Sequence, residues 1–301
     1  MAASTFEVII IGGSYAGLSA AMALGRSRRR VLIIDSGISC NRQTPHSHNF
    51  LTRDGEKPAA IASIARQEVL KYDTVQFQED LAEGVQKTAE GFMVRTASGK
   101  AFNAKKLVFA TGISDMMPAI KGFADCWGIS VVHCPYCHGY ELKELKTGIL
   151  ANGARAVHLA SLVSNLTKDV TIFTMGTAEF TESELNKFAK HNIQLVETVI
   201  TSVQHENGHL HHLGLADGSS LAFDALYAAL PFTQHSAIPQ SLGCEITAQG
   251  YIAIDDFQKT SLQDIYACGD NSSMMRSVAK AVYNGNLAGA MLNKELTDES
   301  F

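Results

Sequence analysis

The 301-residue chain lacks the features that mark several large classes of protein. It has no apolar run of the roughly 20 residues that a membrane-spanning helix needs, because glycines follow the apolar stretch 8–11 at once. Its formal net charge is -5 and its basic run Arg28 to Arg30 is short, so neither nucleic acid nor an acidic membrane is an expected partner. The N-terminus lacks the charged and apolar regions of a secretory signal, which predicts a cytoplasmic protein.

Cysteine is scarce, and of the six cysteines only Cys134 and Cys137 lie close together in sequence. A structural zinc site would need a second C-x-x-C or paired His and Cys residues, and these are missing. The spacing C-x-x-C-H also matches covalent haem attachment, but that chemistry needs export, and a structural disulfide likewise belongs to exported proteins. The pair is therefore predicted to be a redox centre, in which one thiolate attacks a substrate and the other resolves the mixed disulfide.

The size and composition are those of an ordinary globular protein. Hydrophobic residues make up 46% of the chain and charged residues 18%, which is typical of folded domains. A chain of 301 residues exceeds the usual size of a single hydrophobic core, so one large or two medium domains are expected.

A strand, a glycine-rich turn, a helix and a second strand are predicted near the N-terminus. Residues 6–11 are an uninterrupted apolar run typical of a fully buried strand. The turn 12–17 reads G-G-S-Y-A-G, and helix-forming residues 18–24 and a buried strand 31–34 follow it. This order is that of a dinucleotide-binding βαβ unit, although an ordinary βαβ turn remains the alternative.

Four positions of this unit would contact a dinucleotide. Gly12 permits the tight turn, and Gly17 permits close packing of the helix on the strand. Ser14 replaces the usual middle glycine, yet it is small enough for the backbone to approach a pyrophosphate. The helix N-terminus offers unpaired N–H groups to that pyrophosphate, and Asp35 can accept hydrogen bonds from the ribose.

Two later strand ends fit the same ligand. A buried strand that starts at residue 107 runs into A-T-G at 110–112, and a strand over 265–267 runs into C-G-D at 268–270. With the C-x-x-C and a second glycine turn around residue 153, these motifs follow the order of the pyridine-nucleotide-disulfide oxidoreductases. The chain resembles the low-molecular-weight thioredoxin reductases of this family over nearly its whole length.

The resemblance implies an α/β fold of two Rossmann-like, doubly wound, three-layer domains, with the second inserted into the first. An FAD-binding domain would take residues 1–115 and 241–301. An NAD(P)-binding-like domain that carries the cysteines would take residues 116–240. The resemblance also implies a homodimer.

FAD is the cofactor that the resemblance implies. The first glycine turn and Asp35 would hold its adenosine half, Asp270 its ribityl or pyrophosphate region, and the polar loop 41–49 would border the flavin. A helix that starts around 276–278 would direct its N-terminus at the flavin pyrimidine, where the helix dipole stabilises negative charge. The implied cofactor-binding residues are Gly12, Ser14, Gly17, Asp35, Asn41, Arg42, His48, Asn49, Thr111, Gly112, Gly269, Asp270, Arg276, Ser277 and Val278.

The second nucleotide-binding unit departs from the family pattern. A strand over 148–150, a helix through Leu166 and a strand over 170–174 are predicted, but the turn after the first strand reads A-x-G-x-x-A. The residues T-M-G-T-A that end and follow the second strand include neither the acid that binds a ribose diol nor the arginines that bind a 2′-phosphate. The sequence therefore argues against NADPH binding, and almost as strongly against NADH binding.

A degenerate second fingerprint together with C-P-Y-C-H-G-Y-E is similar to the dithiol oxidases that close disulfides in natural products of the gliotoxin and holomycin type. In that branch, electrons pass from a substrate dithiol through the cysteines to FAD and then to oxygen. By resemblance, Cys137 faces the flavin and Cys134 exchanges with the substrate. His138 takes the place of the reductases' acid and can move protons near physiological pH, and Glu141 is a candidate to orient it.

Three functions are compatible with these residues. The first is an FAD-dependent thiol–disulfide oxidoreductase that acts as a dithiol oxidase, the second an NAD(P)H-dependent thioredoxin reductase, and the third a non-catalytic redox-sensing flavoprotein. The substrate would be a small dithiol or disulfide, or a thioredoxin-like protein. No metal is expected, because His209, His211 and His212 lie in a predicted hairpin without partners at coordination spacing.

Overall fold

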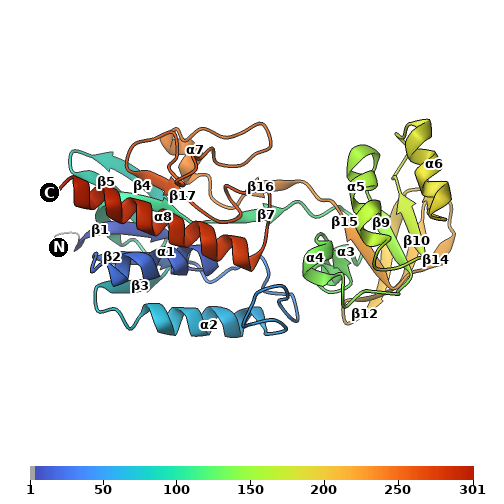
Figure 1. Ribbon diagram of the computed structural model, residues 1–301, viewed down its shortest axis with the longest axis horizontal. Helices are drawn as coiled ribbons and strands as arrows, with labels where there is room; N and C mark the ends of the chain where they lie inside the picture. Colours follow the sequence, from blue (N-terminus) through green and yellow to red (C-terminus); the bar gives the residue numbers. More distant parts are fainter. Residues whose placement is uncertain (1–3) are drawn as a thin grey trace. The chain divides into compact units, whose positions relative to one another are not determined.

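The computed structural model describes residues 4–301, which form two compact units. The first unit comprises the chain up to Arg42, Asn49–Ser114 and Phe232–Phe301. The second comprises Gln43–His48 and Asp115–Pro231, so it is inserted into the first. Each unit contains a parallel sheet with helices packed on it (Figure 1), which confirms the predicted α/β class with two Rossmann-like units.

The first unit is built on a mainly parallel sheet. Its parallel strands are β3 (Val75–Glu79), β2 (Val31–Asp35), β1 (Ser4–Ile11), β6 (Ala101–Phe109) and β17 (Ile265–Ala267), with β17 paired to β6. The antiparallel strands β5 (Gly91–Thr96) and β4 (Ala82–Thr88) extend it beyond β6. Its longer helices are α1 (Tyr15–Arg26), α2 (Pro58–Val69) and α8 (Val278–Asp298).

Both faces of this sheet are buried, which explains the uninterrupted apolar run of β1. Val8 and Ile10 belong to a core with residues of α1 and α8, whereas Ile9 and Ile11 belong to a core on the opposite face. Helices α1 and α8 lie side by side (Figure 1). They are linked by a hydrogen bond from the Ser19 hydroxyl to the carbonyl of Val282 at 2.7 Å.

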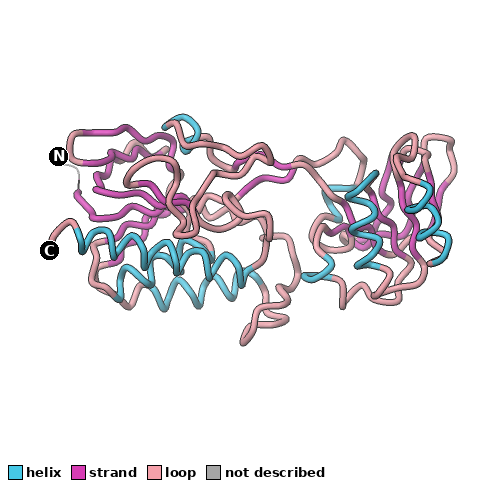
Figure 2. The backbone as a smooth tube through the Cα atoms, turned by 45° about the horizontal axis from the view of Figure 1, so that its top comes forward, coloured by secondary structure: helices cyan, strands magenta, loops and turns pink. Residues whose placement is uncertain are grey.

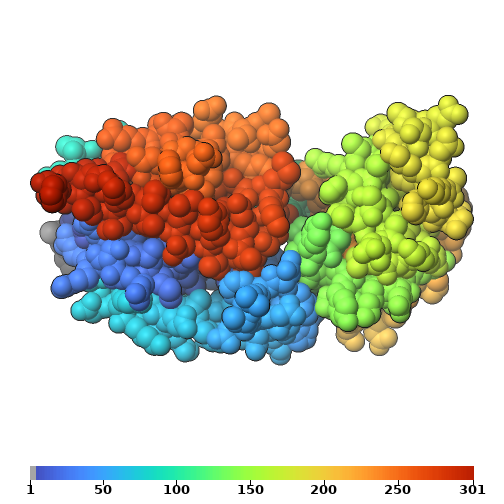
Figure 3. Space-filling model, viewed as in Figure 1, coloured from blue at the N-terminus to red at the C-terminus, as the bar shows by residue number. Residues whose placement is uncertain are grey.

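The second unit has a parallel sheet between helices and a smaller antiparallel sheet. The parallel order is β11 (Gln194–Val196), β10 (Val170–Phe173), β9 (Thr147–Leu150), β15 (Ala225–Ala228) and β8 (Val131–Val132). Helices α5 (Gly153–Val163) and α6 (Glu182–Lys190) share one core with it, and β12 (Ile200–Glu206), β13 (His209–Leu215) and β14 (Ser220–Ala222) contribute to the core on the other face. Figure 2 distinguishes these helices and strands by colour. Phe188 is the one buried residue of α6, and the rest of that helix forms surface (yellow in Figure 3).

The two units divide at other residues than the predicted domains. The C-terminal part of the first unit begins at Phe232 rather than at residue 241, because Gln234 in β16 (Phe232–Gln234) donates to the carbonyls of Gly250 and Asn271. The next helix, α7 (Ile238–Leu242), places Ile238 in the core of the first unit. Strand β7 (Ile113–Asp115) pairs with β16 where the chain passes between the units.

Most predicted elements are present, with shifted ends. The strands expected at 6–11, 31–34 and 265–267 are β1, β2 and β17, whereas the strand expected from 107 is the end of the longer β6. Helix α1 begins before the predicted residue 18, directly after its N-cap Ser14. Helix α5 ends at Val163 instead of Leu166, because the N–H groups of Asn165 and Leu166 bond three residues back and close a tight turn. Strand β10 ends at Phe173, one residue early.

The predicted hairpins are confirmed. β12 pairs with β13 and β13 with β14, both antiparallel. Asn207 and Gly208 both have positive φ, 52° and 83°, as a two-residue hairpin turn requires. Among residues 4–301, no helix combines the length and apolar character that crossing a bilayer requires.

Candidate active site

The glycine turn after β1 brings three segments of the first unit into close contact. Gly12 has a φ of 105°, and a Cβ added there would lie 2.2 Å from the carbonyl oxygen of Ala110. A Cβ added to Gly17 would lie 1.8 Å from the carbonyl oxygen of Gly12. The β1 end, the A-T-G segment and α1 can therefore meet only if both positions lack a side chain.

The N-terminus of α1 is built to receive an anion. Ser14 is the N-cap, but its side chain makes no capping hydrogen bond, so the N–H groups of the first turn keep their capacity for an outside acceptor. Asp35 lies beside this turn: its Oδ1 accepts the N–H of Gly13 at 2.8 Å and its Oδ2 that of Gly37 at 3.1 Å. These bonds fix the carboxylate and leave each oxygen a further lone pair for a ligand hydroxyl.

Asn271 joins the A-T-G and G-D segments and was missed in the sequence. Its side chain is fully buried, and its Nδ2 donates to the carbonyl of Phe109 at 2.9 Å and to Oγ1 of Thr111 at 3.2 Å. Its Oδ1 is also buried and has no hydrogen-bond partner among residues 4–301. A buried acceptor of this kind calls for a donor from a bound group or water. The position of Asn271 directly after Gly269-Asp270 was the feature of the sequence that could have identified it as a site residue.

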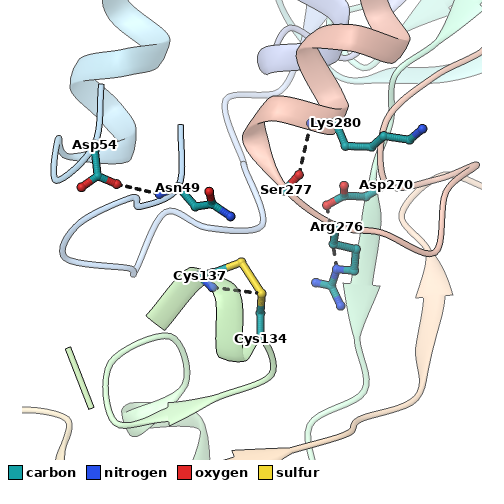
Figure 4. Close-up of a disulfide and its surroundings, with 8 residues drawn as sticks. All are labelled: Asn49, Asp54, Cys134, Cys137, Asp270, Arg276, Ser277 and Lys280. Atoms are coloured by element: carbon teal, nitrogen blue, oxygen red, sulfur yellow. Dashed lines mark hydrogen bonds and ion pairs between the residues drawn. A yellow bond between two sulfur atoms is a disulfide. The ribbon is translucent and has the colours of Figure 1, made fainter. Parts of the chain in front are cut away.

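The start of α8 lies next to the G-D segment. Arg276 Nε is 3.9 Å from Oδ2 of Asp270 (Figure 4), and Cys40 Sγ is also 3.9 Å from that oxygen. Ser277 is the N-cap of α8, and its hydroxyl accepts the N–H of Lys280 at 3.1 Å. The predicted helix start at 276–278 is confirmed.

Hydrogen bonds within the polar loop after β2, and one to α1, hold this loop in place. Asn41 Nδ2 donates to the hydroxyl of Tyr15 at 3.3 Å, and burial raises the pKa of that tyrosine. Arg42 is exposed and donates to the carbonyl of Ser39. The Asn49 backbone N–H donates to Asp54 at 2.7 Å (Figure 4).

The residues present fit FAD: an uncapped α1 N-terminus for the pyrophosphate, a fixed Asp35 for the ribose, and a buried Asn271 oxygen without a donor. Of the predicted cofactor residues, His48 belongs to the second unit, where it pairs with Glu141.

We expect the protein to purify yellow with bound FAD and the variant Gly17→Ala to yield little or no flavin-bearing protein. The added methyl group would have to displace backbone of the turn that receives the pyrophosphate. Soluble yield and the ratio of flavin to protein absorbance measure this effect. Gly84→Ala is the matched control, because nothing lies within 4 Å of its added Cβ. A Gly17→Ala protein with a full complement of FAD would contradict the assignment of the cradle.

The C-x-x-C pair lies in the second unit and forms a disulfide. Cys134 precedes the short helix α4 (Pro135–His138), Cys137 lies within it, and their Cα atoms are 5.3 Å apart. The N–H of Cys137 donates to Sγ of Cys134 at 3.2 Å (Figure 4). Such a bond stabilises negative charge on the sulfur once the disulfide opens.

Aromatic packing supports the turn that carries this pair. Phe123 and Trp127 are buried and stacked with ring centroids 6.0 Å apart, and His133 also stacks with Trp127 at a centroid distance of 6.0 Å. Phe123 and Trp127 are therefore packing anchors in the core of the second unit. His133 is held as part of the same stack.

His138 is surrounded by other titratable groups. Burial lowers its pKa below the ordinary value of 6.5, the charge of Glu141 raises it, and the charge of His48 lowers it. Glu141, the candidate partner of His138, makes its ion pair with His48: Oε1 lies 3.5 Å from Nε2.

The second fingerprint departs from the pattern that binds the pyrophosphate of a nicotinamide dinucleotide. Asn152 Oδ1 accepts the N–H groups of Gly153 and Glu179 at 2.9 and 3.0 Å, and its Nδ2 donates to the carbonyl of Thr177. The α5 N-terminus is thus capped from within, and a Cβ on Gly153 would lie 3.8 Å from the Glu179 carboxylate. Family members bind the pyrophosphate with the N–H groups of this helix N-terminus. Here the pyrophosphate would also lie near the Glu179 carboxylate, whose negative charge would repel it. Arg155 is exposed on the first turn of α5.

One group of acidic residues among residues 4–301 has the spacing of a metal site. It consists of Asp264, Glu295 and Glu299. Lys106 Nζ bonds all three carboxylates, so a lysine supplies the positive charge there. The histidines of β13 are not part of such a group.

Comparison with known proteins agrees with this arrangement. Residues 6–285 match the family model described as pyridine nucleotide-disulphide oxidoreductase. The chain is 32% identical to the thioredoxin reductase aclD of Aspergillus oryzae, over 98% of each chain, and 31% identical to the thioredoxin reductase tcpT of Claviceps purpurea, over 96% of this chain and 94% of that one. An oxidoreductase from Agrobacterium tumefaciens of known crystal structure is 36% identical and superposes with a TM-score of 0.91, covering 98% of this chain and 99% of that one.

The family model spans nearly the whole chain, and the family binds FAD. The cradle of the first unit and the disulfide of the second are the two parts that such a flavoprotein needs. The chain therefore belongs to the pyridine nucleotide-disulphide oxidoreductase family and is an FAD-dependent disulfide oxidoreductase like the thioredoxin reductases.

Proposed function

We propose that the protein is a dithiol oxidase, in which Cys134 and Cys137 pass electrons from a substrate dithiol to FAD and oxygen is the final acceptor. The observation that carries this proposal is the second fingerprint. Asn152 caps the α5 N-terminus there, and Glu179 places negative charge beside it. A flavoprotein of this family that takes no electrons from a nicotinamide can receive them through its cysteines, from a substrate dithiol.

The proposed reaction starts at the disulfide. A substrate thiolate attacks Sγ of Cys134, which forms a mixed disulfide and releases Cys137 as a thiolate. The second substrate thiolate then attacks the bound substrate sulfur and releases Cys134. The substrate leaves as a disulfide, and the protein holds two electrons more in its thiol pair. FAD, when bound, supplies a two-electron carrier between this pair and oxygen.

His138 has the role of a proton acceptor in this proposal. Its half-buried ring has a lowered pKa, because removal from water disfavours the imidazolium. A larger part of the imidazole is therefore neutral near pH 7 and can accept the proton of an incoming thiol. We propose in addition that the cofactor-binding residues named from the resemblance hold FAD, that the protein is a homodimer, and that it is cytoplasmic.

We expect dithiothreitol to bleach the flavin band under anaerobic conditions, and NADPH and NADH to bleach it slowly or not at all. Each missing charge-assisted phosphate contact costs about 1.5–3 kcal/mol, or about ten- to a hundred-fold in affinity. Stopped-flow absorbance with each reductant measures the rates. Admission of oxygen should then restore the band and form hydrogen peroxide.

Two controls separate this function from its alternatives. The names of the relatives favour an NAD(P)H-dependent thioredoxin reductase, and flavin reduction by NADPH at about 10 per second, an ordinary enzyme rate, would establish that function instead. Failure of every dithiol and of NADPH alike would favour a redox-sensing flavoprotein. Cys134→Ser, which lacks the exchange sulfur, should be inert to dithiothreitol.

A further inference from the structure

Three titratable side chains of the second unit gather around the helix that follows Cys134. His138 ends α4, Glu141 follows one turn later, and His48 comes from the segment Gln43–His48 that joins this unit from far away in sequence. His48 Nε2 lies 3.5 Å from Oε1 of Glu141, and their side chains are 20% and 41% exposed. Solvent and a small substrate can therefore reach this group.

The carboxylate of Glu141 acts on the protonation of a neighbour besides pairing with His48. Its charge raises the pKa of His138, whereas the charge of His48 lowers it, against the larger lowering by burial. Tyr227 on β15 completes the surroundings, because its pKa is raised by burial and by the charge of Glu141. Its hydroxyl is buried and has no hydrogen-bond partner among residues 4–301.

We propose that His48 and Glu141 act with His138 as a single proton-accepting cluster for the thiol substrate, with His48 as the second acceptor. This proposal rests on the proposed function. It adds a residue that resemblance assigned to the cofactor, and it gives Glu141 a partner other than His138.

A dithiol loses two protons when it is oxidised, so the site must accept a proton at two successive steps. The first S–H proton leaves when the substrate thiolate attacks Cys134, and the second when the other substrate thiolate releases that sulfur. The substrate loses two electrons when its disulfide forms. The Cys134–Cys137 disulfide gains them as its S–S bond breaks, and becomes a thiol pair. No other oxidant takes part in this half-reaction.

Two imidazoles around one carboxylate suit this sequence. One imidazolium is stabilised by Glu141, whereas a second would be opposed by the first. Protonation of either ring therefore makes protonation of the other harder, and the cluster must pass its proton to solvent before the second thiol is deprotonated. Partial exposure of His48 gives that proton a route.

The test is a pair of substitutions with opposite effects on His138. In Glu141→Gln the pKa of His138 should fall, because a negative charge that favours the imidazolium is lost. In His48→Gln it should rise, because a positive charge that opposes the imidazolium is lost. An NMR titration of the imidazole carbon-bound protons measures both, with the His138 signal identified by its loss in His138→Asn. The exposed His191, which ends α6 in the same unit, gives the matched control His191→Gln, which should leave the titration unchanged.

The same variants should shift the pH dependence of disulfide opening. The rate of flavin reduction by dithiothreitol should rise with pH as His138 becomes neutral. The rising limb of this pH–rate curve follows the pKa of His138, so it should move to lower pH in Glu141→Gln and to higher pH in His48→Gln. At pH 7, His48→Gln should also be slower by about tenfold or more. A purely structural role for His48 would lower the rate without moving the limb.

The outcomes distinguish the two levels of the proposal. If dithiothreitol opens the wild-type disulfide but the limbs and the His138 titration do not move, the cluster is wrong and the oxidase proposal stands. If the titration moves as expected but no dithiol opens the wild-type disulfide, the proposed function fails and the cluster loses its role in thiol oxidation. Opposite shifts in both measurements support the proposal.

Discussion

Replacement of Cys137 by serine should reduce dithiol-dependent flavin reduction to less than about a thousandth of its rate while FAD stays bound. Without Cys137 the protein has no Cys134–Cys137 disulfide for a dithiol to reduce, so the proposed route from the substrate to FAD is interrupted. FAD should remain, because Cys137 belongs to the second unit and the predicted cofactor cradle to the first. Anaerobic stopped-flow reduction and the flavin content of the purified variant measure the two effects.

A trapping experiment assigns the two sulfurs. With a disulfide-containing substrate, Cys137→Ser should accumulate a stable adduct on Cys134, whereas Cys134→Ser should accumulate much less on Cys137. Mass spectrometry of the intact protein and its peptides locates the adduct. Cys244→Ser is the control, because that cysteine is buried in the core of the first unit. An adduct that forms preferentially on Cys137 would reverse the roles.

Lys106→Met should destabilise the first unit by about 3 kcal/mol, or lower its melting temperature by roughly 6–12 °C. The lysine is 1% exposed and its ammonium bonds Asp264, Glu295 and Glu299, so its removal leaves three carboxylates close together without their shared cation. Calorimetry of the purified variant measures the loss. The control is Lys259→Met, whose lysine also contacts Glu295 but is 44% exposed, and its cost should stay below about 1 kcal/mol.

The same network predicts an acid dependence. Burial alone would raise the pKa of Glu295, but hydrogen bonds from Lys259, Tyr266 and Lys106 outweigh it and lower the pKa to about 2. A carboxyl group with a lowered pKa in the folded state contributes stability above its ordinary pKa of 4.5 and loses it as the pH falls toward 2. The wild type should lose stability in that window, and Lys106→Met should lose less there. Equal acid dependence of the two proteins would show that Lys106 does not hold this carboxylate.

Local signals predicted the core of the first unit well. The strands β1, β2 and β17 are apolar runs because parallel strands covered on both faces have no polar side. The glycine turn was readable because backbone contacts at Gly12 and Gly17 exclude side chains.

Contacts between residues far apart in the sequence could not be predicted from local patterns. Lys106 looks like an interruption of a strand, and its partners lie at least 158 residues away. His48 sits in a polar loop, and its neighbour Glu141 became apparent only when the segment Gln43–His48 was placed in the second unit. The hairpin of β4 and β5 has no clean apolar alternation on β4, which is mostly exposed or half-buried.

The packing of α8 against α1 has a consequence for how the polypeptide matures during synthesis. Helix α1 meets its partner only after α8 has been translated, since the Ser19 hydroxyl bonds Val282 and Arg29 bonds Asn293. The long middle segment Asp115–Pro231, by contrast, emerges complete well before that. The face of α1 that packs against α8 must therefore stay uncovered while the inserted unit is translated. Chaperone demand should be concentrated in that interval.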